Sequence, residues 1–126
     1  MPLKNLTADN FNEEVQNHPI AILDFWAPWC APCRTFAPIF EKVSEEYPEI
    51  LFGKINTEDE QELAGHFGIR SIPTATILKE GIGVFSQAGV LPEEALKDLL
   101  EQVKALDMDK VREEIAKEEA EQAQQG

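Results

Sequence analysis

The chain has 126 residues and a mass of 14.1 kDa, which suits one domain around a single hydrophobic core. Its net charge of -13 and pI near 4.4 would repel nucleic-acid phosphates and anionic membranes, so we expect protein partners. The first residues do not resemble a signal peptide, and no apolar run approaches the about 18 residues that span a bilayer. We expect a cytoplasmic protein, although a leader removed earlier would leave the same start.

The first elements in chain order are a helix and a buried strand. Thr7 is placed to cap a helix whose inward positions are Phe11 and Val15. Residues 20–27 are apolar on both faces except for Asp24, which is the pattern of a central strand covered by helices on both sides. A carboxyl group at that place requires either a nearby cation or a functional role.

Two cysteines, Cys30 and Cys33, stand where this strand gives way to a second helix over residues 33–47. The free N–H groups and the positive dipole end of a helix N-terminus stabilise an anion, so Cys30 is predicted to ionise more readily than an ordinary thiol. We interpret Cys30 as a nucleophile and Cys33 as the thiol that resolves its adducts. We predict no zinc site, because His18 and His66 lack the paired spacing of zinc ligands.

The middle of the chain predicts alternating strands and helices. Residues 50–56 form the next strand, and residues 57–60 read as a capping box that opens a short helix ending at Gly68. Residues 74–78 and 84–88 read as an antiparallel hairpin. The whole order predicts an α/β fold with a mixed sheet between helices.

The last helix of the domain and an acidic tail follow. Pro92 is expected at the first helical position of a helix whose inner face holds Leu96, Leu99, Leu100 and Val103. We divide the chain into a domain of residues 1–106 and a helical extension of residues 107–126. The extension has seven acidic and three basic residues, a net charge of -4. Its few apolar side chains form one narrow apolar face. They are Met108, Val111 and Ile115.

Several separated motifs add a more specific signal. They are Asp24-Phe25-Trp26-Ala27, Trp29-Cys30-Ala31-Pro32-Cys33, Lys54, Gly68-Ile69-Arg70-Ser71-Ile72-Pro73-Thr74, and Gly89. In this order the chain resembles the thioredoxin family over roughly residues 3–106. The resemblance implies the thioredoxin fold, a central sheet of parallel strands and one antiparallel hairpin with helices on both faces. The sequence pattern independently predicts the same architecture.

The resemblance implies an enzyme that reduces protein disulfides by thiol-disulfide exchange and serves cell redox homeostasis and electron transport. Cys30 would attack a substrate disulfide, and Cys33 would then release the reduced substrate. The redox-active disulfide would be the reacting group, with no bound cofactor, and NADPH-dependent thioredoxin reductase would recycle it. Expected substrates are of the peroxiredoxin, ribonucleotide reductase and methionine sulfoxide reductase class. We expect a monomer, with weak self-association through the tail as an alternative.

The family pattern also implies roles for residues around the cysteines. Asp24 would be a buried carboxyl of raised pKa that acts through a water on Cys33, instead of a simple paired carboxylate. Lys54 would tune that carboxyl electrostatically, whereas alone it would read as a surface lysine. We predict a cis peptide bond before Pro73, which would let an extended substrate pair with the exposed backbone beside it. The expected substrate rim is Trp29, Ile72, Pro73, Gly89 and Val90.

Two departures from the common family pattern stand near the cysteines. Ala31 replaces a usual glycine and should stiffen the ring slightly, while Pro32 is the residue that reducing members carry. An oxidase or isomerase working outside the cytosol is therefore a weaker alternative. Thr57 replaces a common apolar residue on the substrate face, which would shift partner preference. A further alternative is a holdase or scaffold whose C-terminal helix docks a partner.

Overall fold

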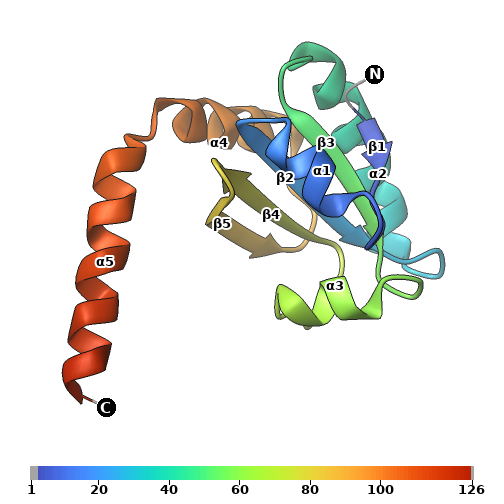
Figure 1. Cartoon of the computed structure of the whole chain (residues 1–126). Coiled ribbons are helices and arrows are strands. Elements are labelled where there is room, and N and C mark those ends of the chain that lie inside the picture. Colours follow the sequence, from blue (N-terminus) through green and yellow to red (C-terminus); the bar gives the residue numbers. More distant parts are fainter. Residues whose placement is uncertain (1–2, 126) are drawn as a thin grey trace.

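The computed structural model describes residues 3–125, as five strands and five helices (Figure 1). In chain order they are β1 (Leu3–Asn5), α1 (Phe11–Gln16), β2 (Ile20–Trp26), α2 (Ala31–Glu46), β3 (Leu51–Asn56), α3 (Gln61–His66), β4 (Thr74–Lys79), β5 (Ile82–Ala88), α4 (Glu93–Ala105) and α5 (Met108–Gln125). No helix in this part of the chain is long and apolar enough to cross a membrane.

The strands form one mixed sheet in the order β1-β3-β2-β4-β5. β1, β3 and β2 are parallel neighbours, whereas β4 is antiparallel to both β2 and β5. The predicted mixed sheet with its antiparallel hairpin is confirmed. β1 was not predicted, because a three-residue edge strand is too short to show an alternating pattern.

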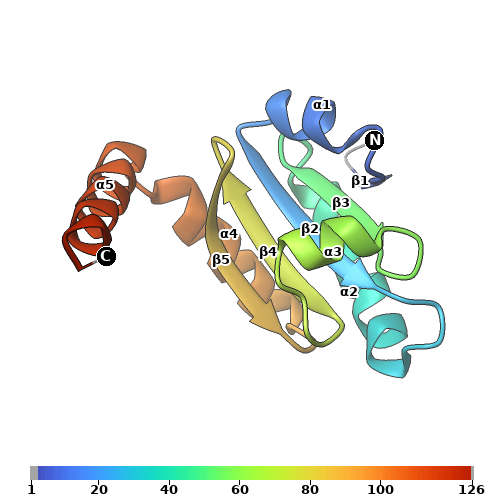
Figure 2. The same cartoon turned by 60° about the horizontal axis from the view of Figure 1, so that its bottom comes forward.

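Helices cover both faces of the sheet, as Figures 1 and 2 show from two directions. On one face α2 and α4 bury apolar stripes. Leu96, Leu100 and Val103 of α4 are buried as predicted, and Leu99 packs partly buried against the same cluster. On the other face α1 and α3 pack on a second cluster through Val15, Leu63 and Phe67. Fully burying such a side chain contributes roughly 1.5–3 kcal/mol relative to leaving it exposed. The two buried faces explain why β2 is apolar on both sides.

A glycine in the interior strand β3 permits one close approach of the chain to the sheet. A Cβ atom at Gly53 would overlap the side chain of Leu6, which is 2% exposed. Leu6 follows β1 and donates its N–H to the carbonyl of Lys54 at 2.8 Å. The missing side chain at Gly53 therefore lets the first segment of the chain lie flat against the sheet.

The predicted cap of the first helix is wrong. α1 begins at Phe11 after Asn10, and no side chain caps it. The Oδ1 atom of Asn10 instead accepts the N–H of Thr7 at 2.8 Å, which closes the preceding turn. Thr7 contributes its carbonyl oxygen to that turn, and its hydroxyl does not cap the helix.

The predicted capping box of the third helix is also wrong. α3 begins at Gln61 with no side-chain cap, because the side chains of the expected box bond elsewhere. The Thr57 hydroxyl donates to the carbonyl of Trp26 at 3.1 Å, and the Glu60 carboxylate accepts the N–H of Ala8 at 2.6 Å. These contacts tie the loop after β3 to other parts of the chain.

The end of α3 agrees with the sequence prediction, whereas the start of α4 differs from it by one residue. Gly68 has φ 65°, and its N–H and that of Ile69 donate to the carbonyls of Gly65 and Ala64, so the predicted helix end is confirmed. Pro92 lies one position before α4, as its N-cap, and is not the first helical residue.

Candidate active site

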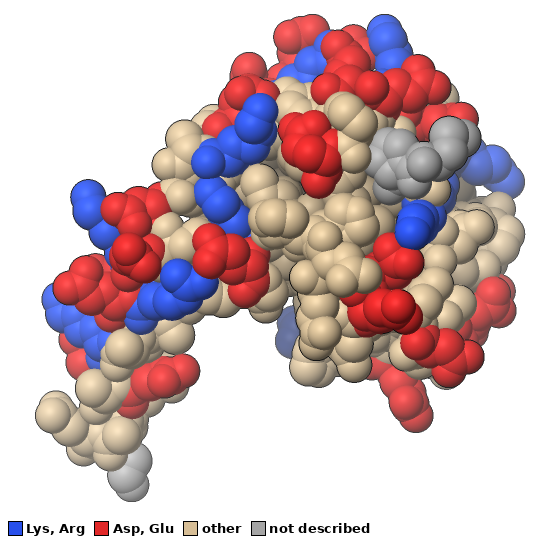
Figure 3. All heavy atoms as spheres, turned by 45° about the horizontal axis from the view of Figure 1, so that its top comes forward, with Lys and Arg blue, Asp and Glu red and all other residues tan. Residues whose placement is uncertain are grey.

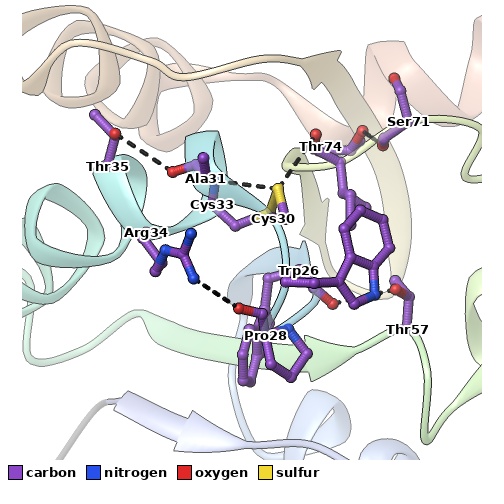
Figure 4. The surroundings of a disulfide bond; sticks show 12 residues. Trp26, Pro28, Cys30, Ala31, Cys33, Arg34, Thr35, Thr57, Ser71 and Thr74 are labelled. Atoms are coloured by element: carbon purple, nitrogen blue, oxygen red, sulfur yellow. Dashed lines mark hydrogen bonds between the residues drawn. A yellow bond between two sulfur atoms is a disulfide. The ribbon is translucent and has the colours of Figure 1, made fainter.

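Cys30 and Cys33 form a disulfide at the junction between the loop after β2 and the start of α2 (Figure 4). Their Cα atoms are 5.2 Å apart. Cys30 is 4% exposed and Cys33 is 3% exposed, and both pack with Ala27, Trp26 and Ile72. The pair is therefore covered by neighbouring side chains, and a substrate has to dock before it can react.

The first turn of α2 points a hydrogen-bond donor at one sulfur. The N–H of Cys33 donates to Cys30 Sγ at 3.2 Å, and Cys30 is the N-cap of this 16-residue helix. Pro32 fits the first turn because its missing N–H would have no partner there. No acidic residue lies in that turn. The positive end of the helix dipole and this N–H both favour negative charge on Cys30 Sγ.

The cis peptide bond between Ile72 and Pro73 lies beside this sulfur, as the sequence predicted. Cys30 Sγ is 3.7 Å from the carbonyl oxygen of Ile72. The N–H of Gly89 donates to the carbonyl of Pro73 at 2.8 Å, with Gly89 at φ 100°, and Val90 follows half-buried. The start of β4 and the end of β5 thus meet next to the cysteine pair.

Trp29 is the most exposed large apolar side chain among residues 3–125, at 64%. Its indole N–H donates to the carboxylate of Glu58, in the loop after β3. Arg34 donates to the carbonyl of Pro28 at 3.2 Å (Figure 4), which holds the loop before Cys30 against α2. Sequence reasoning missed Glu58, because only the fold brings that loop beside Trp29.

Asp24 lies inside β2 and is 1% exposed. Lys54 pairs with it across β2 and β3, and Lys54 Nζ lies 3.8 Å from Asp24 Oδ2. The other oxygen, Oδ1, has no hydrogen-bond partner among the described residues. Burial raises the pKa of Asp24 to about 6, against a smaller lowering by Lys54. This carboxyl therefore takes up and releases a proton near neutral pH.

Lys54 also lies over an aromatic ring. Its Nζ atom is 4.9 Å from the centroid of Trp26, whose side chain also packs beside the cysteines. The lysine is thus held by a carboxylate and a ring face at once. The family resemblance implied the pairing with Asp24, but no feature of the sequence indicated the contact with Trp26.

Comparison with known proteins decides the family. The family model described as Thioredoxin matches residues 2–102. The chain belongs to the thioredoxin family. Putative thioredoxin 2 of Streptomyces coelicolor is 48% identical over 115 residues, which are 91% of this chain and 86% of that protein. The thioredoxin of Bacillus subtilis is 39% identical over 101 residues, which are 79% of this chain and 96% of that protein.

Solved structures agree with this family. A mutant thioredoxin from Halobacterium salinarum matches with a TM-score of 0.78 at 28% identity, over 83% of this chain and 93% of that chain. The thioredoxin of Plasmodium falciparum matches with a TM-score of 0.73 at 32% identity, over 79% and 97%. The predicted thioredoxin fold is confirmed.

Thioredoxins are thiol-disulfide oxidoreductases, and the cysteine pair is the active group of this thioredoxin. Among residues 3–125, no group of three or more His, Cys, Asp or Glu side chains is arranged to hold a metal ion. The geometry around the pair supplies a helix N-terminus, a buried carboxyl group and an exposed apolar surface.

Proposed function

We propose that this thioredoxin is a protein disulfide reductase in which Cys30 is the nucleophile and Cys33 is the resolving thiol. The observation that carries the assignment is the hydrogen bond that the N–H of Cys33 donates to Cys30 Sγ at 3.2 Å, at the start of a 16-residue helix. In the reduced protein the same donor would stabilise a Cys30 thiolate. Ala31 and Pro32 support the site by forming the first turn of this helix.

The reaction proceeds as two exchanges that together carry two electrons. The Cys30 thiolate attacks one sulfur of a substrate disulfide, a Cys30–substrate bond forms, and the other substrate sulfur leaves as a thiolate that takes a proton from solvent. Cys33 then loses its proton and attacks Cys30 Sγ. The Cys30–Cys33 bond forms, and the second substrate sulfur leaves as a thiolate.

Asp24 is proposed as the acceptor of the Cys33 proton, through a water molecule. Its raised pKa of about 6 makes it a base that matches neutral pH better than an ordinary carboxylate. Lys54, 3.8 Å from Asp24 Oδ2, stabilises the ionised form and so sets how readily the proton is taken up. Both residues act near the cysteines without bonding to substrate.

Substrate would bind as an extended segment across the exposed surface beside Cys30. The backbone of Ile72 is close to the sulfur, and the neighbouring Pro73 has no N–H to compete for a substrate carbonyl. Trp29 on one side, with Gly89 and Val90 on the other, would complete the rim. Thr57 bonds to the carbonyl of Trp26, so its hydroxyl offers little to a substrate.

The cellular setting belongs to the same proposal. We place the enzyme in the cytoplasm, where NADPH-dependent thioredoxin reductase would return its disulfide to the dithiol form. Its protein substrates would be peroxiredoxins, ribonucleotide reductase and methionine sulfoxide reductase. Residues 1–106 would hold this activity, and residues 107–126 would be an extension outside it.

Replacing Cys33 by serine tests the order of the two cysteines. Cys33→Ser leaves Cys30 able to attack but removes the resolving thiol, so a mixed disulfide with insulin should accumulate to one per protein molecule. Mass spectrometry under non-reducing conditions would identify the bond at Cys30, and dithiothreitol should release it. A trapped adduct in Cys30→Ser, with none in Cys33→Ser, would show that the roles are reversed.

A further inference from the structure

An apolar groove lies between α5 and the edge of the sheet, at the end of β5 remote from Gly89. It has a volume of about 430 Å³, and its apolar lining comes from Val84 of β5, Leu106 of the α4–α5 linker, and Val111 and Ile115 of α5. Leu106 is 38% exposed and, with Trp29, is one of two exposed large apolar side chains among residues 3–125. Trp29 lies on the catalytic surface. Leu106 lies elsewhere and marks a second candidate interaction surface.

The wall formed by α5 is fixed to the domain. The Lys79 ammonium donates to three carbonyl oxygens at the end of α4 and its linker, those of Val103, Lys104 and Leu106, at 2.8, 3.0 and 2.9 Å. Asp107 Oδ1 accepts two N–H groups in the first turn of α5, at 3.0 and 3.3 Å. Arg112 forms an ion pair with Glu80 in the β4–β5 turn. The groove is therefore present before any partner binds.

Beyond this anchor, α5 extends as an arm from the body of the molecule (Figures 1 and 3). Acidic side chains outnumber basic ones along the groove. Its lining contains one basic residue, Lys110, and three acidic residues, which are Asp107, Glu114 and Glu118.

This charge pattern does not help α5 itself. Glu114 and Glu118 are four residues apart in α5, so their like charges lie side by side on one face and weaken the isolated helix. Neither Glu114 nor Glu118 has an ion-pair partner among residues 3–125. A pattern that disfavours its own helix and lines an apolar groove is expected where a partner supplies the opposite charge.

We propose that this groove docks a cationic amphipathic helix of a partner protein. Its apolar side chains would pack against Val84, Val111 and Ile115, and its lysines or arginines would pair with Glu114 and Glu118. Val111 and Ile115 are four residues apart, the spacing with which one helix receives another. Docking there leaves Trp29 and Cys30 free, so a bound partner would be held beside the disulfide reductase without blocking it.

Two other occupants fit less well. A second copy of α5 would bring glutamates opposite glutamates on the same face, which is repulsive. An added strand would have to follow the edge of β5, but pairing there shifts between Ile77 and Leu78, which leaves Val84 as a bulge. A bulge interrupts the regular hydrogen-bond ladder that an added strand needs.

The probe is a synthetic peptide of about three heptads with leucines on one face and lysines beside them. We expect it to bind the full chain in calorimetry and to shift the NMR signals of Val84, Val111 and Ile115. The double variant Glu114→Lys, Glu118→Lys should bind it at least about tenfold more weakly. The same variant should gain affinity for a matched peptide with glutamates in place of lysines, since the charges that face each other in the groove are then reversed together.

A scrambled peptide of the same composition, with its leucines spread around the helix, is the control. Equal binding of the scrambled peptide would overturn the proposal, because attraction to the net charge would then explain everything. Absence of binding, shifts confined to other surfaces, or sedimentation showing a dimer through this groove would overturn it too. The variant should reduce insulin at the unaltered rate, so failure here and failure of the disulfide reductase assignment are distinguishable.

Discussion

Replacing Cys30 by serine is expected to lower the rate of insulin disulfide reduction on the order of 10³-fold or more, to the background of the reductant alone. A serine hydroxyl remains protonated at neutral pH, and it does not exchange with a disulfide. The helix N-terminus that favours a thiolate at this position cannot make an alkoxide available. The measurement is the initial rate of insulin reduction with dithiothreitol as electron source.

The fold should survive this change, because Cys30 and serine are similar in size and the sulfur accepts a single N–H bond, from Cys33. Circular dichroism and the exposed Trp29 fluorescence provide the control. A folded Cys30→Ser variant that still reduced insulin at a tenth of the original rate would contradict the assignment of the nucleophile.

Replacing Asp24 by asparagine is expected to stabilise the fold at pH 7 by about 1–3 kcal/mol, or roughly 5–10 °C in Tm. Burial raises the pKa of this carboxyl from 3.8 to about 6, so the folded protein holds the proton more tightly than the unfolded chain does. Below pH 4 both states are protonated and the carboxyl costs nothing. As the pH rises from about 4 to 6, the unfolded chain ionises first and the wild-type protein loses stability.

The advantage of Asp24→Asn should therefore grow across that pH range and stay constant above it. A net shift of about two pKa units corresponds to ~3 kcal/mol, and this shift already includes the opposing effect of Lys54. Urea unfolding at pH 4 and pH 7 gives the comparison. Asp59→Asn is the matched control, since Asp59 is exposed and its loss should change stability by less than about 0.5 kcal/mol. Equal stabilisation at both pH values would refute the effect of ionisation.

The same variant should slow the second exchange. Without a base near Cys33, release of the mixed disulfide near neutral pH is expected to fall roughly 10²-fold, while the first attack by Cys30 keeps its rate. Stopped-flow fluorescence separates the two steps. A variant that was less stable than wild type and equally fast would show that Asp24 is a structural ion-pair partner only.

Long periodic segments and the spacing of special residues were enough to predict most of the fold. The inward positions of α4 and the hairpin of β4 and β5 follow from patterns within one segment, so they needed no knowledge of neighbours. The helix caps failed because their side chains have competing partners. The Glu60 carboxylate accepts a hydrogen bond from the N–H of Ala8, 52 residues away, and no local sequence pattern predicts such a contact.

Some features of the site were predicted and others were not, for the same physical reason. The cysteine pair was predicted from its spacing at a helix start, and the cis bond before Pro73 was predicted from the resemblance to the thioredoxin family. The contacts of Trp29 with Glu58 and of Lys54 with Trp26 depend on how separate loops and strands meet. The groove beside α5 depends on the bend that Lys79 holds between α4 and α5, and this bend has no sequence signature.

The reduction potential of the Cys30–Cys33 pair tests the central claim most directly. Equilibration against a dithiol buffer, followed by Trp29 fluorescence, gives the value. Thioredoxin itself is the reference, with a known potential of about -270 mV, and we expect this protein within a few tens of millivolts of it. Such a value would make the dithiol the reactive form in a reducing compartment. A potential above roughly -200 mV would contradict the account, since the protein would then oxidise thiols instead of reducing disulfides.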